Sequence, residues 1–147
     1  MNNIVLLNNR DEATIARLID IWESAVRNTH LFLSERDIAE IKPEALLSLK
    51  TVSILYGYRD GIGALQGFIG VNEKKIETLF VDAKARGQGI GKLLLNYAVN
   101  VLGAKFVDVN EQNNQAVSFY ERFGFRVISR SEYDDQGRPF PLSRLKI

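Results

Sequence analysis

The sequence predicts an α/β fold in which a mixed central sheet is flanked by helices. The first observation behind this prediction is the run of residues 52 to 81, which is rich in β-branched and aromatic residues and lies between two helical stretches. The second is the alternation of short apolar strands with helices further along the chain. We therefore expect the order β-α-α-β-β-β-α-β-α-β-β in a single domain that spans residues 1 to 147.

The first elements are a strand and two helices. Residues 4 to 7 are apolar and predict a short strand, after which apolar side chains recur on one helical face at Ile15, Leu18, Ile19, Trp22 and Val26. Ser34 is placed to cap a second helical stretch, whose apolar face includes Ile38 and Ile41. Pro43 is expected to divide that stretch or to start its second turn, because proline lacks the N–H that a helix interior needs.

The middle of the chain predicts three strands and a long helix. Residues 52 to 58, 64 to 71 and 75 to 81 are joined by the short links RDGIG and NEKK, so we expect an antiparallel meander. Residues 89 to 102 carry apolar side chains at helical spacing, and Gly103 is placed to end that helix.

The C-terminal part predicts a strand, a helix and a pair of strands. Residues 105 to 109 are mostly apolar and predict the strand. Asn113 is placed to open the next helix and Gly124 to close it, around an inner face of Ala116, Val117, Tyr120 and Phe123. Residues 125 to 131 and 142 to 147 are the last two strands, on either side of a polar hairpin.

The composition argues against several classes of function. With 46% hydrophobic and 25% charged residues, the chain is typical of a soluble globular protein, and a net charge of +1 gives no sign of a nucleic-acid partner. The absence of cysteine excludes disulfides and thiolate nucleophiles, and a single histidine, His30, argues against a metal site. No stretch reads as a signal peptide or a membrane span, so we expect a cytoplasmic protein with no membrane partner.

The segment KARGQGIGKLLL, residues 84 to 95, is the clearest candidate for a binding site. It follows a predicted strand and opens a predicted helix, where free backbone N–H groups and the helix dipole favour an anion. The glycine spacing fits neither the P-loop, because Leu93 stands where a Ser or Thr is needed, nor the G-x-G-x-x-G dinucleotide pattern, because Lys92 takes the last position. A glycine-rich turn that binds nothing is the alternative.

Two segments resemble the GNAT superfamily of N-acetyltransferases. VDAKARGQGIGKLLL resembles its acetyl-CoA-binding loop, which reads Q/R-x-x-G-x-G/A. NEQNNQAVSFYERFGF is similar to a second family segment and matches it at Asn113, Ala116, Phe119, Tyr120, Gly124 and Phe125. Both occur in the family's order, and the predicted elements agree with the family fold over nearly the whole chain. IWESAVRNTHLFL also resembles a subgroup of small bacterial acetyltransferases.

The resemblance implies acetyl-CoA as co-substrate and assigns residues to it. The loop amides would hold the pyrophosphate, at Arg86, Gly87, Gln88, Gly89, Ile90, Gly91 and Lys92. The backbone of Leu79, Phe80 and Val81 would pair with the pantetheine arm as an added strand does, and would direct an N–H at the thioester carbonyl. Asn113, with Ala116 of the same segment, would bind the arm from the other side.

Tyr120 is the expected catalytic acid, because a neutral phenol can protonate the departing thiolate; a structural aromatic side chain is the alternative. For the base, Asp108 lies in the otherwise apolar run FVDV, at a spacing from Asn113 that some family members use. Glu77, on the strand before the loop, is its competitor. Either acid could instead lie on a solvated strand face, and a water chain could replace both.

The acceptor pocket is expected near His30, with Trp22 and Phe32 close in sequence, although a lone histidine at a helix end is more often a cap or a packing group. Tyr133, Asp134 and Phe140 are weaker candidates.

We therefore predict an N-acetyltransferase that transfers the acetyl group directly to a primary amine of a small molecule or peptide, in a ternary complex and as a monomer or homodimer. Direct transfer is expected because the chain has no cysteine and no convincing serine triad. A non-catalytic coenzyme A-binding or sensing module on the same fold is the alternative. A nucleotide-binding protein is a third, which the missing magnesium-binding hydroxyl disfavours.

Overall fold

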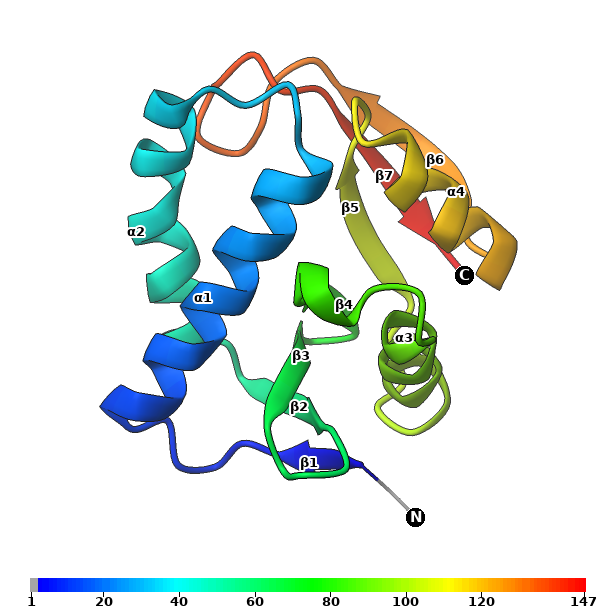
Figure 1. The fold of residues 1–147 in the computed structure, drawn as a ribbon. Helices are drawn as coiled ribbons and strands as arrows, with labels where there is room; N and C mark the ends of the chain where they lie inside the picture. Colours follow the sequence, from blue (N-terminus) through cyan, green and yellow to red (C-terminus); the bar gives the residue numbers. More distant parts are fainter. Residues whose placement is uncertain (1–2) are drawn as a thin grey trace. The chain divides into compact units, whose positions relative to one another are not determined.

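The computed structural model describes residues 3 to 147. Its elements are β1 (Ile4–Leu6), α1 (Glu12–Thr29), α2 (Glu35–Thr51), β2 (Ile54–Arg59), β3 (Leu65–Asn72), β4 (Lys75–Val81), the 3₁₀ turn η1 (Ala83–Ala85), α3 (Ile90–Asn100), β5 (Phe106–Asn110), α4 (Asn114–Phe123), β6 (Arg126–Ser131) and β7 (Leu142–Lys146) (Figure 1). This order of strands and helices confirms the predicted order and the α/β class. The chain divides after Ala104 into two compact units, and each is described by itself; the single domain stays a prediction.

In the first unit, strands β1 to β4 form an antiparallel sheet in chain order, which confirms the predicted meander. β3 and β4 are in register at Gly67 and Val81, but the register shifts further along. Thr78 lies opposite Gly70 and Ile76 lies opposite Val71, so Glu77 is an extra residue without a partner in β3. A bulge of this kind bends the strand and changes the direction of the side chains around it.

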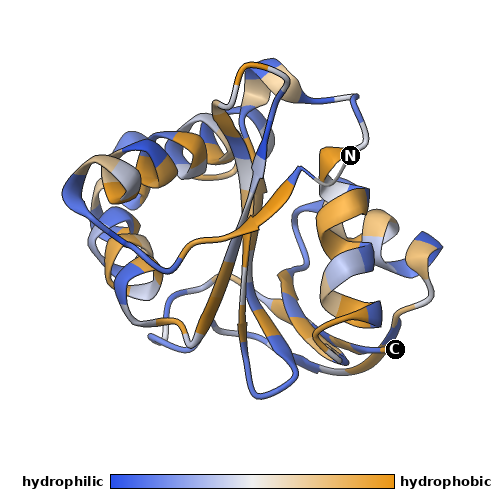
Figure 2. Ribbon diagram, turned by 90° about the horizontal axis from the view of Figure 1, so that it is seen from below, coloured by the Kyte–Doolittle hydropathy of each residue, from blue (hydrophilic) through white to orange (hydrophobic). Residues whose placement is uncertain are grey.

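Helices cover both faces of this sheet. α1 and α2 lie side by side on one face. With β2, β3 and two residues of the connecting segments, Leu7 and Val52, they form a core of Leu7, Ile15, Leu18, Ile19, Ile21, Trp22, Val26, Ile38, Leu49, Val52, Leu55, Leu65 and Phe68. α3 packs on the other face, where Gly67 leaves room for the side chains of Ile90 and Leu94. Figure 2 shows the apolar stripes of the helices turned toward the strands.

Side chains cap the starts of both α1 and α2, and at α2 the cap is the predicted Ser34. Asp11 accepts a hydrogen bond from the N–H of Thr14, and Ser34 forms a capping box with Asp37. The expectation for Pro43 is wrong in both forms: Pro43 neither divides the helix nor starts its second turn, because α2 runs from Glu35 to Thr51 with Pro43 in its middle. Burial of Ile38 and Leu49, on either side of the proline, stabilises the continuous helix despite the missing N–H. Among residues 3 to 147, no helix is long and apolar enough to cross a membrane.

The second unit is a three-stranded antiparallel sheet with one helix. β7 lies between β5 and β6, with Asp108 of β5 opposite Arg144 of β7. α4 packs against β5, and the buried apolar side chains of this unit are Val107, Val109, Tyr120, Phe125 and Leu145. Asn113 caps α4 and Gly124 ends it with a φ of 126°, as the sequence predicted.

Candidate active site

The turn before α3 depends on two glycines. Gly87 and Gly89 both have a φ of 80°, in the left-handed region that other residues adopt only with strain. A Cβ at either position would meet nothing within 4 Å, so the backbone angle, and not space, requires glycine there. Gly89 is the N-cap residue of α3, and no side chain caps this helix.

The backbone amides of this turn are open. None of the N–H groups of residues 87 to 92 donates a hydrogen bond to the described part of the chain, and the first bond into α3 runs from the N–H of Leu93 to Gly89 at 3.0 Å. Arg86 and Lys92, at the two ends of the turn, are exposed and add positive charge. Converging N–H donors at the positive end of a helix dipole form a site for an anion such as a phosphate.

The strand that leads into this turn presents two different faces. Phe80 lies opposite Phe68, with the rings 5.9 Å apart, on the face that α1 and α2 cover. Leu79 and Val81 alternate with Phe80 and lie on the face that α3 covers, because Val81 is opposite Gly67. All three residues are partly exposed. The predicted loop and the predicted pantetheine-binding strand are therefore contiguous in the first unit.

Asp82, between β4 and η1, is a residue that the sequence reasoning missed. Its side chain is buried and accepts hydrogen bonds from Arg17, Ser24 and the N–H of Lys84. Burial opposes ionisation of this carboxyl, but these donors together hold the pKa of Asp82 below its usual range. The sequence offered one sign of the role of Asp82, because it is a short polar residue directly after a strand and before a glycine turn. Nothing in the sequence indicated that Arg17 is its partner.

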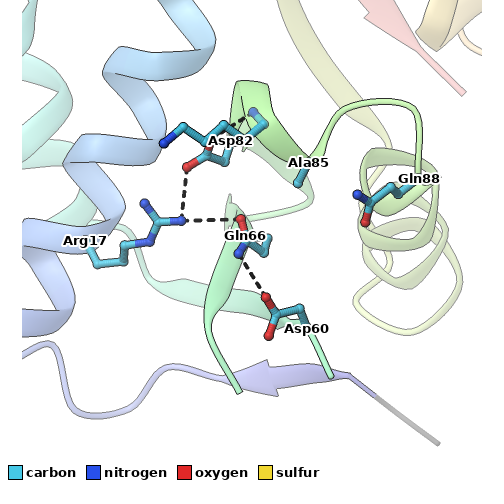
Figure 3. A pocket seen from close by; sticks show the side chains of 7 residues that line it. Arg17, Asp60, Gln66, Asp82, Ala85 and Gln88 are labelled. Atoms are coloured by element: carbon cyan, nitrogen blue, oxygen red, sulfur yellow. Dashed lines mark hydrogen bonds and ion pairs between the residues drawn. The ribbon is translucent and has the colours of Figure 1, made fainter. Parts of the chain in front are cut away.

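A pocket of about 350 Å³ adjoins the turn on the side of α1. It is lined by Arg17, Asp60, Gln66, Asp82, Lys84, Ala85 and Gln88 (Figure 3). Four of its polar side chains are already joined to one another: Arg17 donates to Asp82 and Gln66, and Gln66 donates to Asp60 at 3.0 Å. The pocket is therefore mainly an internal network that reaches the turn, rather than a set of groups awaiting a ligand.

In the second unit, Asn113 is the N-cap residue of α4, in addition to its predicted role in binding acetyl-CoA. Its side-chain oxygen accepts a hydrogen bond from the N–H of Ala116 at 3.2 Å and caps α4. The cap uses only Oδ1, so the amide NH2 takes no part in it. Neither Asn113 nor Ala116 is thereby shown to bind acetyl-CoA, and both stay predictions.

Tyr120 lies on α4, and its side chain is buried. The ring packs edge-on against Phe119 and Phe125, with centroids 5.2 Å and 5.6 Å away. Within residues 3 to 147 the Tyr120 hydroxyl makes no hydrogen bond. Burial raises the pKa of Tyr120 above the usual value, which keeps the phenol protonated.

The two candidate bases differ in their surroundings. Asp108 accepts a hydrogen bond from Arg144 at 2.6 Å, so the partner that a half-buried carboxylate requires is an arginine on the neighbouring strand. Glu77, at the bulge in β4, is exposed and forms no hydrogen bond or ion pair with residues 3 to 147. Partial burial of Asp108 therefore needs no catalytic explanation, whereas Glu77 has no structural partner.

The predicted acceptor residues separate into two groups. Trp22 is 5% exposed within the core under α1, so packing accounts for it. His30 is the C-cap residue of α1. The centroid of its ring lies 5.4 Å from that of Phe32 and 6.4 Å from that of Phe80 in β4. The Thr29 hydroxyl donates to Ala25 and so accepts from Nδ1–H of His30, while burial lowers the pKa of His30 to about 4. His30 is thus a neutral group beside β4.

Comparison with known proteins agrees with this geometry. The family model of the acetyltransferase (GNAT) domain matches residues 46–143. The peptidyl-lysine N-acetyltransferase YjaB of Salmonella typhimurium is 40% identical over 129 residues, which are 88% of each chain. The solution structure of apo-form YjaB from Escherichia coli has a TM-score of 0.86 and 34% identity over 97% of this chain and 96% of that chain. The PaiA N-acetyltransferase of Thermoplasma acidophilum, solved in complex with coenzyme A, shares the fold with a TM-score of 0.69 and 21% identity over 100% of both chains.

Proposed function

Since the chain belongs to the GNAT family of acetyltransferases, we propose that it transfers the acetyl group of acetyl-CoA to the side-chain amine of a lysine in a peptide or protein. The relative from Salmonella typhimurium, which carries peptidyl-lysine in its name, supports this acceptor class. The coenzyme A complex of the Thermoplasma acidophilum protein supports the donor.

One observation carries the proposal: the open N–H groups of residues 87 to 92 at the start of α3. A helix end normally satisfies its first amides with a side-chain cap, as α1 and α2 do here. At α3 the N-cap residue is the left-handed Gly89, which has no side chain to cap these donors. The pyrophosphate of acetyl-CoA has the charge and the acceptor oxygens that such a set of donors binds.

The proposed reaction needs a positioned thioester, an acid and a base. The backbone of Leu79, Phe80 and Val81 pairs with the pantetheine arm and directs one N–H at the thioester oxygen, where negative charge develops. The lysine amine attacks the acetyl carbon, a C–N bond forms, and the C–S bond breaks. Tyr120 then protonates the departing thiolate, which its raised pKa and the lack of a hydrogen bond from its hydroxyl within residues 3 to 147 support.

The amine must also lose a proton before or during attack, and we assign this step to Glu77. Its carboxylate is exposed at the bulge of β4 and has no ion-pair partner within residues 3 to 147. Asp108 is the other candidate, and we rank it behind Glu77 because its carboxylate is already paired with Arg144. A water molecule between Glu77 and the amine is compatible with this assignment.

The test is a thiol-release assay with acetyl-CoA and a panel of amines. The panel contains a lysine peptide, the same peptide with arginine in place of lysine, a peptide whose only amine is its N-terminus, and a small polyamine. We expect thiol release and an acetylated product, identified by mass spectrometry, with the lysine peptide alone. If the protein binds acetyl-CoA but no amine supports release, it is a coenzyme A-binding module instead. Release with another amine alone would overturn the lysine assignment.

A further inference from the structure

The start of the glycine turn is fixed to α1 by a buried carboxylate. Oδ2 of Asp82 accepts a hydrogen bond from Arg17 at 3.0 Å, and Oδ1 accepts from Ser24 at 3.3 Å and from the N–H of Lys84 at 3.0 Å. Asp82 is 6% exposed, and both side chains that bind it, Arg17 and Ser24, lie about two turns apart on α1. The carboxylate is therefore an attachment point between α1 and η1.

Ser24 strengthens this attachment because it acts twice. Its hydroxyl oxygen accepts a hydrogen bond from the N–H of Ala83 at 3.1 Å while the hydroxyl proton is given to Asp82. Arg17 is held in turn by the carbonyl of Leu65, to which Nη2 donates at 2.7 Å and Nε at 3.0 Å. Figure 3 shows Arg17 reaching from α1 to Asp82 just before the chain turns toward Gln88. The position of η1 is thus set by several directional bonds.

The open amides follow η1 directly and have no bonds of their own. The N–H groups of residues 87 to 92 make no hydrogen bond within the described chain, and Gly87 and Gly89 give the backbone unusual freedom. The orientation of such donors depends on the segment on either side: α3 after the turn, and η1 before it. Binding sites of this kind need a supporting set of bonds, because small displacements of donors weaken binding.

We propose that Asp82 is a positioning residue for acetyl-CoA, which holds η1 against Arg17 and Ser24 and thereby sets the direction of the N–H groups that bind the pyrophosphate. This inference rests on the proposed function. It assigns Asp82, Arg17 and Ser24 a role in the affinity for acetyl-CoA, although these residues do not themselves contact acetyl-CoA. It also predicts that the network affects binding of acetyl-CoA and leaves the chemical step unchanged.

The main experiment is Asp82→Asn, with Asp60→Asn as the matched control. In Asp82→Asn the new NH2 group faces the donor Nη2 of Arg17, so this bond is lost while Oδ1 still accepts from Lys84. Asp60 lines the same pocket and accepts from Gln66, Ile62 and Ala64, and none of these partners belongs to η1. We expect Asp82→Asn to raise the Kd for coenzyme A and the KM for acetyl-CoA about tenfold, with kcat at saturating acetyl-CoA unchanged. Asp60→Asn should leave both constants unchanged.

A lower melting temperature for Asp82→Asn with an unchanged Kd for coenzyme A would mean that the network serves stability alone, and would overturn the proposal. So would an equal rise in Kd for Asp60→Asn. Absence of acetyl-CoA binding by the natural protein would instead overturn the proposed function itself. The two failures are therefore distinguishable by measuring the unsubstituted chain first.

A second pair of variants keeps the test valid if Asp82→Asn does not fold. Ser24→Ala removes the acceptor of the Ala83 N–H and one donor to Asp82, whereas Ser24→Thr keeps the hydroxyl. We expect Ser24→Ala to raise the Kd for coenzyme A about threefold and Ser24→Thr to restore it. Equal affinity in Ser24→Ala and the natural protein would contradict the proposal.

Discussion

The chain contains two strand–turn–helix segments that solve the same structural problem in different ways. In β4–α3 the acid of the strand, Glu77, is exposed and has no side-chain partner among residues 3 to 147, and the helix begins without a side-chain cap from this part of the chain. In β5–α4 the acid of the strand, Asp108, is paired with Arg144, and Asn113 caps the helix. The carboxylate and the first helix amides thus have no side-chain partner in the first segment, within residues 3 to 147, whereas in the second segment other residues of the chain bind the carboxylate and cap the helix.

This difference indicates where a ligand is to be expected. Unsatisfied backbone donors reduce stability unless water or a ligand satisfies them. Within residues 3 to 147, side chains cap the starts of α1, α2 and α4 but not that of α3, so we expect a ligand at the start of α3. Tyr120 is the exception within β5–α4, because its hydroxyl makes no bond in the described chain. We infer that β4–α3 serves the reaction by binding acetyl-CoA through its backbone, and that β5–α4 serves it through one side chain, Tyr120.

The largest expected effect is that of Tyr120→Phe. Loss of a general acid lowers kcat by about 10²-fold or more, whereas the Kd for acetyl-CoA should not change, because we propose that the backbone of β4–α3 binds it. Since the raised pKa keeps the phenol protonated, Tyr120 should produce no fall in kcat up to about pH 10. Steady-state kinetics across pH and calorimetry of binding measure both quantities. Unchanged kcat would remove Tyr120 from the mechanism.

The next largest effect is expected at Gly89, the uncapped start of α3. Gly89→Asp places a carboxylate at the open start of α3, while Gly89→Asn adds an uncharged side chain of the same shape, and both residues tolerate the left-handed φ of 80° better than most. A charge at a helix N-terminus is worth up to about 2 kcal/mol, so Gly89→Asp should bind coenzyme A about thirtyfold more weakly than Gly89→Asn. Titration calorimetry of the two variants compares them directly, and equal affinities would show that no anion binds at this helix end.

A smaller effect distinguishes the two acids. Glu77→Gln should lower kcat/KM for the lysine acceptor about tenfold near neutral pH, because the amine loses its proton acceptor. Asp108→Asn should mainly lower the melting temperature, because Arg144 loses its ionised partner. Parallel measurement of kcat/KM and thermal unfolding separates the two roles. A large loss of kcat/KM in Asp108→Asn alone would reverse the assignment.

The sequence predicted element order and helix ends well because these depend on local chemistry. Ser34, Asn113 and Gly124 act where capping rules place them. The continuity of α2 through Pro43 could not be predicted, since burial on a neighbouring helix outweighs a local preference. The pairing of Asp108 with Arg144 joins strands that are distant in sequence, and so does the attachment of Asp82 to Arg17. Glycine spacing indicated the open turn, but not the network that holds it.

The smallest effect tests whether the helix cap of β5–α4 has a second role. Asn113→Ala should reduce the free energy of unfolding by about 1 kcal/mol, because the N–H of Ala116 loses its acceptor. Asn113→Ser keeps a capping oxygen and should restore stability, yet it lacks the NH2 group that the cap does not use. If Asn113 serves α4 alone, the serine variant will also bind acetyl-CoA normally. Weaker binding by a variant of normal stability would show that the NH2 group contacts the donor, so that this segment too contributes to binding.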